Sequence, residues 1–195
     1  MSESRKIALF GGTFDPVHLG HIHIAQAARD ALDLDEVRFI PCRISPFKTT
    51  NAPSSPEDRI EMLRLAIHEL PWTVVDDFEV QREGPSYSWQ TAEAMKARFP
   101  NSRLFWIMGT DQWELLTDWA HPEKLAACVE FIVFGRGNTP QAREGYRMHS
   151  VTAVHPASAT EIREAFRNGA TGHDWLHPEV AALINSRKLY GASRS

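Results

Sequence analysis

The residues best suited to chemistry lie in one turn near the start of the chain. It runs from Gly11 to His21 and reads Gly-Gly-Thr-Phe-Asp-Pro-Val-His-Leu-Gly-His. Gly11 and Gly12 let a ligand approach the backbone closely, and the helical pattern that follows offers free N–H groups to an anion. His18 and His21 are three residues apart, so both imidazoles can share the first helical turn, and Gly20 leaves room beside them. The turn predicts a phosphate site; two surface histidines beside a tight turn are the alternative.

Other nucleotide and metal patterns do not describe this turn. It contains neither Gly-x-Gly-x-x-Gly nor Gly-Lys-Ser/Thr, so it is not a dinucleotide fingerprint or a Walker loop. The chain has no His-Glu-x-x-His and no paired cysteines, the usual signs of a zinc site. We therefore expect an anion site without a protein-held metal.

A second anion site is predicted late in the chain. Ser158 and Glu161 have the spacing of a capping box, so a helix begins there. The hydroxyls of Ser158 and Thr160 then lie at its N-terminus, with Arg163 in its first turns. A helix N-terminus with a guanidinium can bind an oligophosphate. An ordinary cap beside a solvated arginine is the alternative.

Four further side chains could meet a ligand. Asp111 follows Gly109, which ends a predicted strand. A carboxylate there can accept hydrogen bonds from ribose hydroxyls, can cap the next helical turn, or can do both. Trp119 could stack on a planar ring or belong to the core. Lys48 and Arg136 lie in predicted loops whose composition is typical of mobile segments. Each side chain could bind a second phosphate or remain solvated.

The elements that must position these residues alternate regularly. The patterns predict the following strands and helices. Strands are expected at 6–10, 37–40, 73–75, 104–108, 129–134 and 151–154, and helices at 19–32, 55–70, 86–99, 122–128, 158–168 and 178–186, with a helical turn after Asp111. This alternation predicts an α/β fold with a doubly wound parallel sheet. Ligands bind such sheets beyond the carboxyl ends of the strands, which here are Gly11, Pro41, Gly109 and Gly135.

Composition narrows the class of protein. The chain has 195 residues, of which 43% are hydrophobic and 24% charged, as in an ordinary globular domain. A net charge of −4 argues against broad nucleic-acid binding. Cys42 and Cys128 suggest no disulfide, so we expect a cytoplasmic protein. We find no signal peptide and no apolar run near the roughly 18 residues of a membrane span.

On these motifs the chain resembles the nucleotidylyltransferase superfamily, whose signature is (His/Thr)-x-Gly-His. The longer string resembles that of the bacterial nicotinate-nucleotide adenylyltransferases, and the resemblance covers nearly the whole chain. Its further segments are Ser45–Lys48, Ser86–Ser88, Met108–Asp111, Trp119, Ser158–Arg163 and Leu189–Gly191. Two departures stand out: Phe47 replaces a loop histidine of the family, and Ala157 and Ala159 replace residues that are often Ile and Ser.

The resemblance implies a Rossmann-like nucleotidylyltransferase fold over a single domain, 1–195, with a small C-terminal helical part from about residue 156. It implies adenylyl transfer from ATP to nicotinate mononucleotide in NAD biosynthesis, with Mg²⁺ carried by the ATP phosphates. His18 and His21 would be catalytic. The ATP site would comprise Gly11, Gly12, Thr13, His18, His21, Gly109, Asp111, Ser158, Thr160 and Arg163. The mononucleotide site would comprise Phe14, Asp15, Lys48, Ser88, Trp119 and Arg136.

Other functions remain open from the sequence. The acceptor could be nicotinamide mononucleotide or phosphopantetheine, because a fold does not fix a substrate. A non-catalytic adenine-nucleotide sensor would not need both histidines. A tRNA synthetase core also carries a His-x-Gly-His string, but the short, acidic chain argues against it. Oligomeric state is left open.

Overall fold

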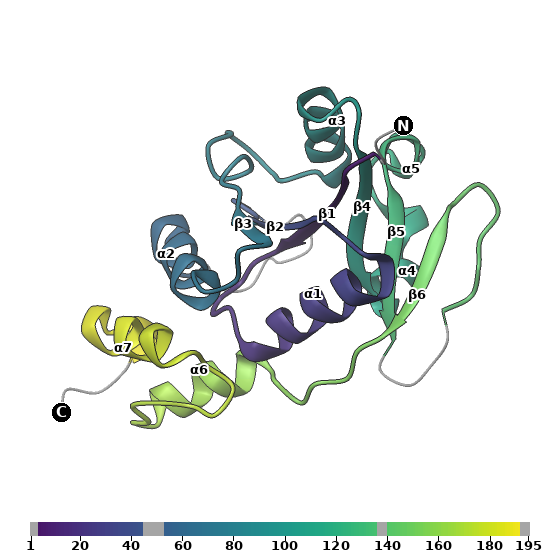
Figure 1. Cartoon of the computed structure of the whole chain (residues 1–195). Coiled ribbons are helices and arrows are strands. Elements are labelled where there is room, and N and C mark those ends of the chain that lie inside the picture. The colour runs from purple at the N-terminus through teal and green to yellow at the C-terminus, as the bar shows by residue number, and fades with distance from the viewer. Residues whose placement is uncertain (1–3, 45–52, 136–139, 192–195) are drawn as a thin grey trace.

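The computed structural model describes residues 4–44, 53–135 and 140–191. Its centre is a six-stranded sheet with the strand order β3-β2-β1-β4-β5-β6 (Figure 1). Every neighbouring pair of strands is parallel, which confirms the expected doubly wound sheet. The strands are β1 (Lys6–Gly12), β2 (Glu36–Pro41), β3 (Thr73–Val75), β4 (Arg103–Gly109), β5 (Glu130–Gly135) and β6 (Met148–Thr152).

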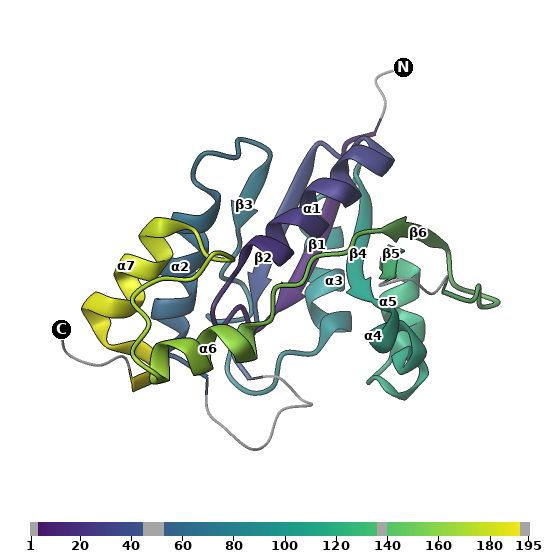
Figure 2. The same cartoon turned by 90° about the horizontal axis from the view of Figure 1, so that it is seen from below.

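Helices cover both faces of the sheet. Alternate strand residues point to opposite sides, and apolar side chains on both sides must be covered. In β1, Ala8 and Phe10 join one apolar cluster, whereas Ile7 and Leu9 join the other. The first cluster contains residues of α1 (Leu19–Leu32), α2 (Pro56–Ile67), α6 (Ala159–Arg167) and α7 (Pro178–Arg187). The second contains residues of α3 (Ser88–Arg98), α4 (Thr110–Glu114), η1 (Leu116–Asp118) and α5 (Pro122–Cys128). Figures 1 and 2 show these two helical layers.

The order of the strands creates one switch point. From β1 the chain moves outward through β2 to β3, and then returns to place β4 on the other side of β1. It continues outward through β5 to β6. Loops that leave β1 and β4 therefore diverge, and open a crevice at their carboxyl ends. The glycine-and-histidine turn follows β1, and Gly109 ends β4.

Two of the predicted elements differ most from the structure in their boundaries. The last strand was expected at 151–154, but β6 is Met148–Thr152 because its backbone pairs with β5 from Phe131↔Met148 to Gly135↔Thr152. Val154 lies beyond this pairing and is 61% exposed. The helix expected to reach residue 70 ends at Ile67, where the N–H of Leu70 donates to the carbonyl of Ile67 in a turn.

The C-terminal helices belong to the same layer as α1. Ile162 and Phe166 of α6 and Val180 and Ile184 of α7 are fully buried in the first apolar cluster. The connection from β6 to α6 runs past α1, and α7 lies beside α2 (Figure 2). After α7 the short helix η2 (Leu189–Gly191) contacts α6. Within the described ranges, no helix has the length and apolar character to cross a membrane.

Candidate active site

A cavity of about 1400 Å³ opens at the carboxyl edge of the sheet, over β1 and β4. Eleven of the residues predicted to bind substrates line it: Gly11, Gly12, Thr13, Phe14, His18, His21, Ser88, Gly109, Asp111, Trp119 and Ser158. Asp15, Thr160 and Arg163 are not part of this lining. Lys48, Arg136 and the altered loop with Phe47 fall outside the described residues.

The two histidines form a compact unit at the start of α1. His18 is the N-cap residue in an extended conformation, and its backbone N–H donates to Nδ1 of His21 over 3.2 Å. The rings stack with centroids 3.8 Å apart and planes 28° apart. Because Nδ1 of His21 accepts a hydrogen bond, its proton in the neutral ring is on Nε2. His21 can therefore present an Nε2–H donor to a ligand oxygen.

Glycines make room for this arrangement. A Cβ on Gly20 would lie 3.0 Å from Nδ1 of His18 and 3.2 Å from Cβ of Ala157, both closer than an ordinary contact. A Cβ on Gly12 would lie 2.9 Å from the Phe14 ring. Glycine at position 20 thus lets α1 lie close to the His18 ring and to Ala157, and glycine at position 12 lets Phe14 pack close to β1.

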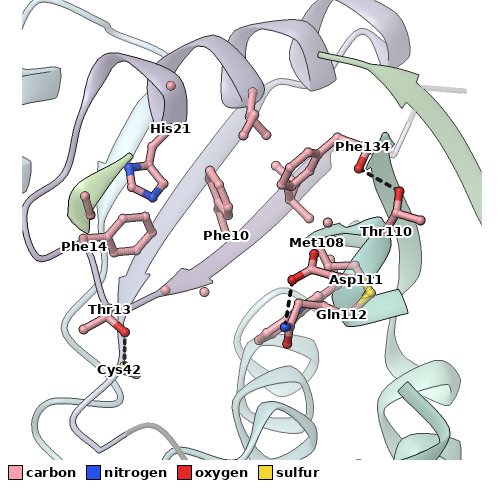
Figure 3. Close-up of a pocket in the computed structure, with 18 of the residues that line it drawn as sticks. Phe10, Thr13, Phe14, His21, Cys42, Met108, Thr110, Asp111, Gln112 and Phe134 are labelled. Atoms are coloured by element: carbon pink, nitrogen blue, oxygen red, sulfur yellow. Dashed lines mark hydrogen bonds between the residues drawn. The ribbon is translucent and has the colours of Figure 1, made fainter. Parts of the chain in front are cut away.

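Phe14 connects the strand to the histidines. It is 2% exposed and adopts φ 50°, in the left-handed region that bulky residues seldom enter. Its ring makes an edge contact with His21 at 5.0 Å and with Phe10 at 5.6 Å. Figure 3 shows Phe14 and His21 together on one side of the end of β1. The side chain therefore packs beneath the histidine pair in this structure.

The opposite wall comes from β4 and α4. Figure 3 shows Asp111 and Thr110 across the crevice from His21. Thr110 Oγ1 donates to the carbonyl of Phe134, which ties α4 to β5. A Cβ on Gly109 would lie 2.5 Å from Oδ1 of Asp111, so only glycine there lets the carboxylate occupy its present place. Asp111 is exposed, and can accept hydrogen bonds from a ligand.

A third part of the lining surrounds the start of α3. Ser86, Tyr87, Ser88 and Trp119 line the cavity here together with Glu79. Glu79 is 6% exposed, and its Oε1 accepts a 2.6 Å hydrogen bond from the hydroxyl of Thr91. Burial raises the pKa of its carboxyl.

Sequence reasoning missed several titratable residues of the lining, among them Glu79 and His155. Nδ1 of His155 accepts the N–H of Ala157 over 3.1 Å, and burial and the nearby His23 lower its pKa. Neither residue belongs to a local chemical pattern. Only the position of His155, shortly after a predicted strand and before Ser158, could have drawn attention to it.

The late segment caps a helix as predicted, but its arginine faces another partner. Ser158 Oγ accepts the N–H of Glu161 at 3.5 Å at the start of α6. Arg163 Nη1 donates to the carbonyl of Asp15 at 2.7 Å, and Nη2 donates to Thr160 Oγ1 at 3.2 Å. These two bonds use two of the five guanidinium N–H donors. Phosphate binding by Arg163 and Thr160 stays a prediction.

The charge of the lining is unusual for a site that would take phosphates. Its described residues include five carboxylates, Glu79, Asp111, Glu114, Asp118 and Glu161, and neither lysine nor arginine. No group of three or more metal-ligating side chains occurs in the part of the chain that the structure describes. Within the described lining, a bound anion can be met by the N–H groups at helix N-termini, by histidine N–H donors, or by an ion that the ligand brings.

A doubly wound sheet with a histidine pair at the first helix N-terminus, on the switch-point crevice, defines a Rossmann-like nucleotidyltransferase. Residues 9–165 match the family model described as cytidylyltransferase-like. The chain is 39% identical to the probable nicotinate-nucleotide adenylyltransferase of Geobacillus kaustophilus, over 96% of this chain and 87% of that protein. It is 35% identical to the nicotinate-nucleotide adenylyltransferase of Bacillus subtilis, over 95% and 98%.

A solved structure shares the fold. The nicotinic acid mononucleotide adenylyltransferase of Plasmodium falciparum, complexed with NaAD, aligns with a TM-score of 0.76 at 19% identity, over 97% of this chain and 98% of that one. The identity and coverage of the sequence relatives extend the likeness beyond the fold. The chain belongs to the nicotinate-nucleotide adenylyltransferase family, and it is a nucleotidyltransferase enzyme.

Proposed function

We propose that this chain transfers the adenylyl group of ATP to nicotinate mononucleotide, which gives deamido-NAD and pyrophosphate in NAD biosynthesis. The observation that carries the proposal is the stacked His18–His21 pair at the N-terminus of α1, facing a cavity large enough for two nucleotides. The two described cysteines, Cys42 and Cys128, are thiols, which supports the expected cytoplasmic location.

The reaction needs positioning and charge stabilisation more than covalent catalysis. The nucleophile is the 5′-phosphate of the mononucleotide. Its second pKa is about 6, so it is largely a dianion at neutral pH and requires no general base. One of its oxygens forms a bond to the α-phosphorus of ATP as the bond from that phosphorus to the β-phosphate oxygen breaks. The electron pair leaves with pyrophosphate.

The proposed role of the histidines follows from their geometry. The Nε2–H of His21 and the imidazole of His18 stabilise charge on the α-phosphate oxygens in the transition state. The free N–H groups at the start of α1 favour the same anion. Gly11, Gly12 and Thr13 let the phosphates approach the end of β1.

The remaining contacts are proposed for the two substrates. Beside Gly109, the carboxylate of Asp111 accepts hydrogen bonds from the ribose hydroxyls of ATP. The β- and γ-phosphates of ATP are held by Ser158, Thr160 and Arg163. On the acceptor side, Trp119 and Ser88 line the region where the pyridine ring would lie. Phe14, Lys48 and Arg136 complete the proposed mononucleotide site, and Asp15, which does not line the cavity, supports it from the same turn.

A divalent metal fits this cavity as a companion of ATP. The described residues hold no carboxylate cage for it, so we propose that Mg²⁺ is bound by ATP oxygens and water. When bound it neutralises phosphate charge. Its presence would also offset the carboxylates of the lining, of which Asp111 belongs to the predicted ATP site.

The test is pyrophosphate release from ATP and Mg²⁺, with nicotinate mononucleotide, nicotinamide mononucleotide and phosphopantetheine offered in parallel. We expect strong preference for the nicotinate substrate. Preference for another acceptor would overturn the substrate assignment but keep the reaction class. ATP binding without turnover of any acceptor would instead indicate a nucleotide-binding protein.

A further inference from the structure

Asp15 is held by three segments that lie far from it in the sequence. The hydroxyl of Tyr190 donates to Oδ1 over 2.7 Å, across a separation of 175 residues. The backbone N–H of Ser54 donates to Oδ2 over 3.2 Å. Arg163 donates to the carbonyl oxygen of Asp15 over 2.7 Å. Asp15 is only 9% exposed and does not line the cavity.

The position of Asp15 bears directly on the histidine pair. It follows Phe14, whose left-handed backbone is unfavourable for a bulky residue and persists only where the surroundings hold it. The Phe14 ring touches His21, and His18 begins α1 three residues after Asp15. A shift of Asp15 would therefore reach both imidazoles, one through ring packing and one through the backbone.

The environment of Tyr190 keeps its hydroxyl as the hydrogen-bond donor to Asp15. Burial and the charge of Asp15 raise the pKa of Tyr190, so its hydroxyl keeps its proton at neutral pH. Its backbone is also left-handed, with φ 61°. The oxygen lies 3.9 Å from Sδ of Met62 in α2, so it sits between that helix and the turn. A separate ion pair, Arg187 to Asp58 at 2.6 Å, ties α7 to α2 without touching Asp15.

We infer that Tyr190 is a positioning residue for adenylyl transfer: through its hydrogen bond to Asp15, the C-terminal segment sets the place of Phe14 and of the two histidines. The inference rests on the proposed function, because it assigns the histidines to the transition state. It also assigns Asp15 to the support of the turn and not to direct contact with the mononucleotide.

The test compares Tyr190→Phe with the wild-type chain in the pyrophosphate-release assay. Loss of the hydrogen bond should displace the two imidazoles by well below 1 Å. We therefore expect kcat to fall about tenfold, because displacements of catalytic groups near 1 Å can lower the rate about 100-fold. KM for both substrates should stay within about twofold, since Tyr190 and Asp15 do not line the cavity. Arg187→Gln is the matched control: it loosens the same C-terminal segment from α2 and should leave kcat unchanged.

Two further measurements separate positioning from general stability. Asp15→Ala, which removes both side-chain acceptor oxygens, should lower kcat at least as much, and the double variant should be no worse than Asp15→Ala alone, because the bond to Tyr190 is then already lost. Histidine side-chain NMR signals of His18 and His21 should shift in Tyr190→Phe but not in Arg187→Gln. This readout does not depend on turnover, so a wild-type chain that is inactive refutes the proposed function and leaves the inference testable.

The inference is overturned if Tyr190→Phe keeps wild-type kcat and histidine signals, or if Arg187→Gln loses as much kcat. It is also overturned if Asp15→Ala raises only the KM for the mononucleotide. That result would return Asp15 to substrate binding.

Discussion

Replacement of Gly109 by alanine tests whether Asp111 binds ATP from its present position. The backbone of Gly109, at φ −79° and ψ 163°, suits alanine, so the change adds no backbone strain. The new Cβ would lie 2.5 Å from Asp111 Oδ1, whereas ordinary contacts begin near 3.4 Å, so the carboxylate must move by about 0.9 Å. That exceeds the roughly 0.5 Å within which a binding group must be held.

The size of the effect follows from the bond that is lost. A hydrogen bond to a charged group contributes about 1.5–3 kcal/mol, so kcat/KM for ATP should fall about 10- to 150-fold. The free energy of unfolding should change by less than about 1 kcal/mol, because the displaced carboxylate is exposed. Steady-state kinetics with varied ATP and a denaturant titration measure the two quantities.

Gly172→Ala is the control, because a Cβ there meets no atom within 4 Å. Asp111→Ala should lose as much as Gly109→Ala, and the double variant no more than either. If Gly109→Ala keeps kcat/KM for ATP within twofold, Asp111 does not hold ATP from this position.

Three further predictions address catalysis, the acceptor and pH. Alanine in place of His18 or His21 should lower kcat by about 10²- to 10³-fold with a much smaller change in ATP affinity, measured by calorimetry; a kcat within a few-fold of wild type contradicts their assigned role. Trp119→Ala should raise KM for the mononucleotide about tenfold and leave KM for ATP unchanged, with Trp119→Phe intermediate; equal changes in both constants would indicate a core role. Because the pKa of Glu79 is raised, the folded state binds its proton more tightly than the unfolded state, and stability falls as pH rises above about 4.5 toward the folded pKa. Glu79→Gln should therefore gain more in Tm at pH 7 than at pH 4, and melting curves that differ equally at both pH values would contradict this.

The general form of the fold could be read from local patterns. Apolar segments that end in glycine, such as 6–10 before Gly11 and 104–108 before Gly109, alternate with helical spacing, and this alternation determines a parallel sheet with its ligands at one edge. The bounds of the last strand could not be read in this way, because pairing with β5, and not the local run of apolar residues, sets them.

The sequence by itself determined the class of the site and its family, because the turn that holds His18 and His21 is a contiguous string whose chemistry depends on neighbours in the chain. Only the tertiary structure decided which residues share the cavity. Glu79 and His155 came into it, whereas Arg163 and Tyr190 were brought onto Asp15. The reason is physical: a helix start or a strand end is set by bonds between near residues, but a contact across 175 residues depends on how α6, α7 and the sheet pack.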